Sequence, residues 1–281
     1  VNWTDKFSMQ FGLKADVPTA SGQFYWQPRV NARVDLTSKW NVHAAWGLYN
    51  QFVSKNTIVD ELGNRSEVWQ VADGQNASVL SATHTVLGLN YNSNALEFGV
   101  EGFHKNSEGF SRFFFNRNGN TVFIEGEAKT MGLELFARKR IWSHEFWLSY
   151  TLSEVEERFS NQFRTSEFQL APQSQQHELK AVASFNFNPI RFSVTDVYGS
   201  GFPNSVLIRG QDEFEPYWRT DLALQYAFRM RGMEMEAGLS ILNLFNRRNV
   251  RLNQSITTPG GARINTVGIP FTPTFYVNFG F

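Results

Sequence analysis

The chain has 281 residues with 26 basic and 26 acidic side chains, so its formal net charge is zero and a nucleic-acid partner is not expected. It contains no cysteine, which excludes disulfides, thiolate chemistry and cysteine metal sites. Phenylalanine is abundant, with 27 residues, but no apolar run reaches the roughly 18 residues of a transmembrane helix. Length and composition leave one large domain or two small ones, and also a membrane protein built from strands.

Apolar and polar residues alternate with a period of two along the whole chain, which predicts about twelve antiparallel strands. In chain order, the predicted strands cover residues 7–13, 29–36, 42–48, 85–91, 96–101, 131–138, 146–152, 179–187, 190–194, 221–228, 233–241 and 267–281. The last strand carries Phe271, Phe275, Val277, Phe279 and the terminal Phe281 on one face. A soluble sheet would bury such a face in a core, whereas a transmembrane barrel turns it toward lipid.

The opposite face of these strands carries charges, which decides its direction in a membrane barrel. Near the bilayer midplane, Arg or Lys on the lipid side costs about 2–4 kcal/mol. The charges are therefore expected to point into a wet lumen, where they line a permeation path or bind a plug and one another. They are Arg29, Arg33, Glu97, Glu101, Glu134, Lys180, Asp221, Glu234 and Glu236.

Short and long connections alternate between the predicted strands. Tight turns are expected at 37–39, 92–94, 139–141, 188–189 and 229–231, and longer loops at 14–23, 53–78, 105–127, 153–175, 199–216 and 247–263. Outer-membrane barrels have short periplasmic turns and long extracellular loops. The predicted fold class is therefore an all-β, antiparallel, up-and-down transmembrane β-barrel. Its aromatic girdle is expected to include Trp40, Tyr91, Trp142 and Phe187.

Several segments resemble landmarks of the TonB-dependent outer-membrane receptors, in the same order over nearly the whole chain. They are Trp26–Val30, Trp46–Gln51, Lys129–Leu135, Trp147–Ser153, Gln176–Leu179, Gly199–Pro203, Tyr217–Leu222 and Leu242–Asn246. The approach to the last strand, Gly268–Pro273, resembles receptors of Bacteroidota.

The resemblance implies that residues 1–281 are the C-terminal half of a 22-stranded barrel, without the plug domain of such receptors. It implies active uptake of a scarce nutrient across the bacterial outer membrane, gated through a plug by the TonB energy-coupling system. No enzymatic activity, catalytic residue, metal or cofactor is expected. The expected partners are membrane lipids and lipopolysaccharide, with a surface lipoprotein as a further candidate.

Two loop features are the candidate substrate-binding residues. The run Phe110, Arg112, Phe113, Phe114, Phe115 and Arg117 could stack on a planar ligand and pair with its acid groups. Trp69, in the longest loop, is the second candidate. For both, the alternative is that the aromatic side chains pack the loops together or meet a partner protein.

Other functions remain alternatives. A self-closed passive pore of twelve strands and a structural subunit of a larger outer-membrane complex both fit the strand pattern. An outer-membrane phospholipase or protease would need a Ser–His pair, for which Ser81 with His84 and Ser143 with His144 are neighbours in sequence. The acidic run 212–215 could hold Ca²⁺, although a solvated loop is the expected role.

Overall fold

The computed structural model describes residues 2–4, 6–19, 21–59, 65–73, 77–115, 121–159, 167–171, 173–202, 216–230, 232–249, 256–257, 263–264 and 268–280. In these ranges the regular structure is all β. None of these residues belongs to a helix long and apolar enough to cross a membrane.

Eighteen strands occur in the described residues. Their bounds are β1 Asn2–Thr4, β2 Phe7–Asp16, β3 Tyr25–Asp35, β4 Trp40–Gln51, β5 Val53–Val59, β6 Arg65–Val71, β7 Leu80–Asn92, β8 Leu96–Phe115, β9 Thr121–Ile141, β10 His144–Phe159, β11 Gln169–Leu170, β12 His177–Phe187, β13 Ile190–Gly199, β14 Tyr217–Met230, β15 Met233–Leu242, β16 Ile256–Thr257, β17 Arg263–Ile264 and β18 Thr272–Gly280. The main sheet has the order β1-β2-β3-β4-β7-β8-β9-β10-β12-β13-β14-β15-β18, and β11 pairs with β10.

All twelve predicted strands occur, as β2, β3, β4, β7, β8, β9, β10, β12, β13, β14, β15 and β18. The strands that the sequence did not predict are short. They are β1, β11 and the two separate hairpins, β5–β6 and β16–β17. Neighbours in the main sheet follow one another along the chain, as an up-and-down topology requires.

The chain divides into two compact units. Unit 1 comprises Val1–Leu89, Glu101–Gly132 and Glu154–Ala171. It contains β1 to β4, most of β7, the longer parts of β8 and β9, the last residues of β10, and β11. Its hairpin β5–β6 forms a sheet of its own, with seven consecutive residue pairs from Val53 with Val71 to Val59 with Arg65.

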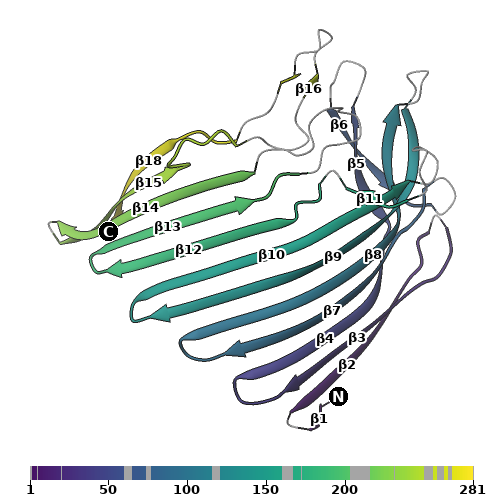
Figure 1. Ribbon diagram of the computed structural model, residues 1–281, viewed down its shortest axis with the longest axis horizontal. Coiled ribbons are helices and arrows are strands. Elements are labelled where there is room, and N and C mark those ends of the chain that lie inside the picture. Colours follow the sequence, from purple (N-terminus) through teal and green to yellow (C-terminus); the bar gives the residue numbers. More distant parts are fainter. Residues whose placement is uncertain are drawn as a thin grey trace. The chain divides into compact units, whose positions relative to one another are not determined.

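Unit 2 comprises Asn90–Val100, Leu133–Ser153 and Pro172–Phe281. Its strands β12 to β15 are side by side in Figure 1, coloured green to yellow, and the short turns β12–β13 and β14–β15 both lie at the left of the view. The pairing of β12 with β13 is regular over ten residue pairs, from Glu178 with Gly199 to Phe187 with Ile190. A regular ladder preserves the alternation of side chains between the two faces.

The apolar faces of the predicted strands are exposed. Leu13 in β2 is 68% exposed and Phe279 in β18 is 55% exposed, and Trp46, Leu87 and Leu224 are exposed as well. The buried hydrophobic side chains among the described residues are few: Ala72, Ala77, Phe159, Ala171 and Met235. A soluble sandwich would bury the alternating apolar side chains, so this pattern is that of a wall whose apolar side meets lipid.

Several predicted connections differ from the structure, and two of them show why. The expected loop 105–127 is mostly strand, because β8 continues to Phe115 and β9 begins at Thr121. Polar side chains stand on both sides of this extension, so the alternation that signals a strand is lost there. The turn expected at 139–141 lies instead at 142–143, after β9 has run to Ile141. Trp142 has a φ of 52°, in the left-handed region that tight hairpin turns use.

In unit 2, the segment Leu242–Asn246 links the end of β15 to the residues that precede β18 through hydrogen bonds. Asn243 is buried, and its side-chain amide donates to the carbonyls of Arg247 and Ile269 at 2.9 and 2.8 Å. Its side-chain oxygen accepts from the Arg247 N–H at 3.0 Å. Both Asn243 and Asn246 have positive φ, a conformation that Asn tolerates better than most residues. Both asparagines therefore have a structural role in the segment.

Candidate functional site

The polar face of unit 1 carries a layer of rings and charges that lie flat on the sheet. The His43 Nε2 atom is 3.0 Å from the Glu101 carboxylate. The His43 ring lies against Gly88, where an added Cβ atom would come within 2.1 Å of its Cε1 atom. Glycine at position 88 is therefore what lets the imidazole cross the sheet surface and reach Glu101.

Tyr49 holds a second group of side chains on the same face of unit 1. The Arg29 guanidinium lies 4.6 Å from the centre of the Tyr49 ring, at a distance suited to a cation–π contact. The His84 ring meets Tyr49 edge-on, with 6.3 Å between the ring centres. The predicted lumen residue Arg29 is thus held against an aromatic ring of the neighbouring strand.

Unit 2 has the same kind of polar face. Tyr276 lies over Gly238, where an added Cβ would approach the ring to 2.2 Å. Its hydroxyl accepts from the Gln225 amide at 2.9 Å and donates to Glu236 at 2.8 Å.

Several charges of the polar faces, among them the predicted lumen residues Arg33, Glu101, Asp221 and Glu234, pair with charges on the same or a neighbouring strand. The ion pairs are Arg33–Asp35 at 2.9 Å, His43–Glu101 at 3.0 Å, Arg138–Glu145 at 3.0 Å, Arg219–Asp221 at 3.0 Å and Arg229–Glu234 at 2.6 Å. Pairing of this kind balances charge on a hydrophilic face.

The structure places Trp69 on β6, in the hairpin β5–β6 of unit 1. Its side chain is 67% exposed, and the Lys55 ammonium lies 5.8 Å from its ring centre. Lys55 also pairs with Glu67. Val53 and Val71 face each other at the base of the hairpin and are exposed. One side of this hairpin therefore combines an exposed tryptophan with apolar and charged neighbours, as a ligand-contacting surface would.

The structure places the phenylalanine run differently from the predicted loop. Phe110 lies in β8 and meets Phe159 of β10 edge-on at 5.2 Å, and Phe159 is only 6% exposed. This contact fits the packing role that was the alternative for the run. Arg112, Phe113, Phe114 and Phe115 also belong to β8, but their side chains are outside the described residues, as is the whole of Arg117.

A further cluster in unit 1 was not predicted from the sequence. The Lys129 ammonium and the Arg158 guanidinium lie 4.1 and 4.6 Å from the centre of the Phe168 ring. Arg158 also pairs with Glu127 at 2.6 Å. Arg158 and Phe168 fall in residues 153–175, which were predicted to be a loop, whereas β10 continues to Phe159. The sequence therefore provided no strand register that would bring these side chains to Lys129.

Of the two Ser–His pairs considered for catalysis, Ser143 with His144 does not form a nucleophile and its base. The Ser143 hydroxyl donates to the Asn186 carbonyl at 2.9 Å, and His144 Nδ1 accepts from the Asn186 N–H at 3.1 Å. Both side chains therefore bind the backbone of β12. The described residues hold no group of three His, Cys, Asp or Glu side chains suited to a metal ion, and the acidic run 212–215 lies outside them.

Solved structures with the same fold are outer-membrane receptors and transporters. One is a mutant of the ferric enterobactin receptor of Pseudomonas aeruginosa in complex with enterobactin (15% identity, TM-score 0.69), which covers 98% of this chain and 43% of the receptor. Another is the ferric-catecholate import receptor Fiu of E. coli K12 (16% identity, TM-score 0.65), where the match covers 98% of this chain and 42% of the receptor. A third is the copper transporter OprC (16% identity, TM-score 0.68), where the match covers 99% of this chain and 46% of the transporter.

The chain spans less than half the length of these receptors. A search of curated proteins found no match. The sequence model of the family described as "TonB dependent receptor-like, beta-barrel" matches residues 1–246, which confirms the resemblance and the barrel class. The chain therefore belongs to the TonB-dependent receptor-like β-barrel family of the bacterial outer membrane.

Proposed function

We propose that this chain forms part of the barrel wall of an active uptake receptor, which carries a scarce nutrient through the outer membrane by TonB-coupled gating. Members of the family are transporters rather than enzymes. The solved structures of the same fold include receptors for ferric enterobactin and ferric catecholates and a copper transporter. These ligands differ chemically, so the fold supports metal or metal-chelate uptake as a class without selecting one nutrient.

The observation that carries this proposal is the two-faced wall. Exposed apolar side chains alternate with a polar face on which ion pairs and glycine-backed rings lie flat. Side chains that lie flat keep the interior open for a plug or a polar solute. A barrel with an apolar exterior and a hydrophilic interior is suited to moving polar cargo through lipid.

We also propose that residues 1–281 are the C-terminal half of a larger barrel, with the charges of its polar face directed at a plug that couples to TonB. The share of the solved receptors that this chain covers, 42% to 46%, supports this division. Contacts with lipopolysaccharide and a surface lipoprotein stay predictions.

Within this function, the hairpin β5–β6 and the run at 110–117 are the proposed substrate contacts. Trp69 supports the first, because a large aromatic ring exposed beside a lysine can stack on a ligand and place a cation near its acid groups. Phe110 supports the second less directly, since its ring already packs on Phe159.

The test is nutrient uptake by cells of the native host with the gene deleted or restored. A panel of ferric siderophores, free metal ions and organic nutrients is supplied at limiting concentration, with and without a protonophore. We expect uptake of one class to depend on the gene and to stop when the protonophore collapses the proton-motive force. Uptake that survives the collapse would instead indicate a passive pore.

A further inference from the structure

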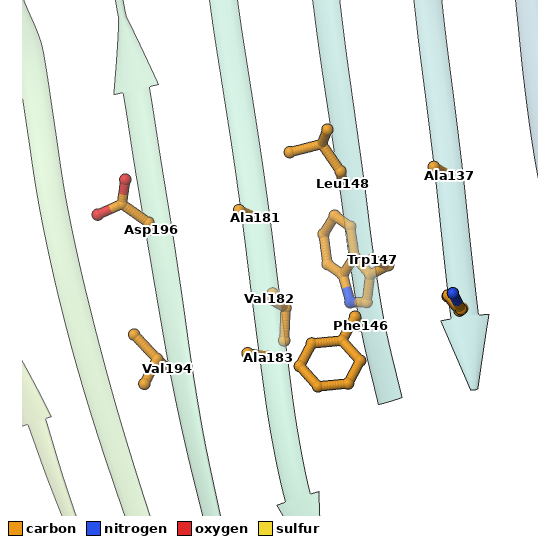
Figure 2. A pocket seen from close by; sticks show the side chains of 10 residues that line it. Ala137, Phe146, Trp147, Leu148, Ala181, Val182, Ala183, Val194 and Asp196 are labelled. Atoms are coloured by element: carbon orange, nitrogen blue, oxygen red, sulfur yellow. The ribbon is translucent and has the colours of Figure 1, made fainter. Parts of the chain in front are cut away.

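The lipid-facing side of unit 2 has a groove where four strands, β9, β10, β12 and β13, lie side by side. Its floor is formed by the small side chains Ala181 and Ala183 of β12. Phe146 and Leu148 of β10 border it on one side, and Val194 of β13 borders it on the other (Figure 2). The hollow has a volume of about 330 Å³ and is lined mainly by apolar atoms.

The register explains why a groove forms there. Ala181 stands between Leu148 and Asp196, and Ala183 stands between Phe146 and Val194. Two small side chains in successive rows, with larger ones beside them, leave a trough along β12. A flexible hydrocarbon chain fits such a trough. Because lipid tails are as apolar as the groove, van der Waals contact alone gives little preference for one lipid.

A preference for one lipid headgroup over another can come from Lys139. It lines the groove from β9 and is exposed, and it makes no ion pair with any described residue. The two-residue turn at 142–143 places it opposite Phe146, and Ala137 and Ile141 are its neighbours on the same face. This lysine therefore stands among apolar side chains on the lipid side, without a counter-charge from the described part of the chain.

The nearby carboxylates are already engaged. Glu145 binds Arg138 at 3.0 Å and Arg140 at 3.6 Å, and it lies on the opposite face from Phe146. Asp196, at the other end of the groove, accepts from the Trp218 indole at 2.9 Å and from the Thr220 hydroxyl. The indole and the hydroxyl are neutral donors, so Asp196 keeps its negative charge at its own end of the groove, and the positive charge of the groove is located at the Lys139 end.

The position of Lys139 along β9 shows which leaflet of the outer membrane it faces. It lies three residues before Trp142, about 10 Å along the strand, and Trp142 is 89% exposed in a short turn. Short turns of outer-membrane barrels are periplasmic, and exposed tryptophan is typical of the membrane interface. A lysine on the lipid side is tolerated at this level, where it can reach the headgroup region.

We propose that this groove seats one glycerophospholipid of the inner leaflet, with an acyl chain along Ala181 and Ala183 and its phosphate paired with Lys139. The site combines an apolar trough with one uncompensated cation at headgroup depth. An anionic headgroup gains more from that cation than a zwitterionic one, so phosphatidylglycerol is expected to bind more tightly than phosphatidylethanolamine.

The experiment is native mass spectrometry of the isolated native protein, titrated separately with phosphatidylglycerol, phosphatidylethanolamine and lipid A. Lys139→Gln is expected to weaken the first phosphatidylglycerol binding step about fivefold, the usual contribution of one basic residue at a lipid surface. Ala181→Phe, which fills the trough and keeps the charge, is expected to lower phospholipid retention as well.

Two matched controls test the location. Lys39→Gln removes a lysine from the β3–β4 turn, and Ala237→Phe enlarges an alanine on the apolar face of β15, so both should bind phospholipid as the unmodified protein does. Equal binding by Lys139→Gln and the unmodified protein would overturn the proposal. A preference for lipid A that depends on Lys139 would overturn the choice of occupant. If Ala181→Phe does not fold, the Lys139 comparison alone decides.

Discussion

At the scale of single residues, the period-two alternation identified which side chains share a face, and the exposed apolar residues confirm it. Leu13, Leu87 and Leu224 are examples. The contacts on the polar face could not be predicted in the same way. That His43 crosses Gly88 to reach Glu101 depends on the register of strands that are far apart in sequence. Alternation specifies the face of a residue but not its neighbour on the next strand.

Gly88→Ala tests this contact. The new methyl group would overlap the His43 ring, whose nearest atom is 2.1 Å from the Cβ position, so the ring must move and its bond to Glu101 is lost. We expect the free energy of unfolding to fall by about 1–3 kcal/mol, as for other overpacked sites. Urea unfolding of the detergent-solubilised protein, followed by tryptophan fluorescence, measures the change.

Gly12→Ala is the matched control, because Gly12 is also a strand glycine of unit 1 and its Cβ position is 3.8 Å from the nearest atom, Arg29 Cβ. That substitution should leave stability unchanged or raise it by about 0.4–1 kcal/mol. Equal stability of the two variants would show that the ring does not need glycine beneath it.

At the scale of elements, the sequence predicted the twelve long strands but not how far they extend. β8 and β9 run for 20 and 21 residues, well into the segment expected to be a loop. Beyond the bilayer both faces of a strand meet water, so polar residues occupy both and the alternation disappears. The short hairpin β5–β6, which was also missed, forms a sheet separate from the main one.

The hairpin β5–β6 gives a prediction at this scale. Trp69→Ala is expected to weaken binding of the transported nutrient roughly tenfold, because stacking on an exposed ring is lost. The stability of the barrel should not change, since the side chain is mostly exposed. Equilibrium binding to cells that carry the protein measures the effect, with the nutrient identified by the uptake panel.

Trp142→Ala is the corresponding control, because Trp142 is also exposed but lies in a short turn of unit 2. It should bind the nutrient normally. An unchanged affinity in Trp69→Ala, or an equal loss in both variants, would remove the hairpin from the proposed binding surface.

At the scale of the whole molecule, the twelve long strands, the alternation of short and long connections and the family could all be predicted from the sequence. Each depends on local patterns that repeat, such as the apolar residues of the last strand or the motif Leu242–Asn246. The nutrient could not be predicted, because relatives of this fold bind different ligands and specificity resides in loops. The central claim is a wall with lipid on one face and a wet interior on the other.

The most direct measurement of that claim is a single-cysteine scan along β14 with nitroxide spin labels, in the native protein reconstituted into lipid bilayers. The chain has no cysteine, so each label reports one position. We expect membrane-dissolved oxygen to reach labels at 222, 224 and 226, and a water-soluble nickel chelate to reach those at 223, 225 and 227. Accessibility that does not alternate, or that alternates with the two faces exchanged, would contradict the account.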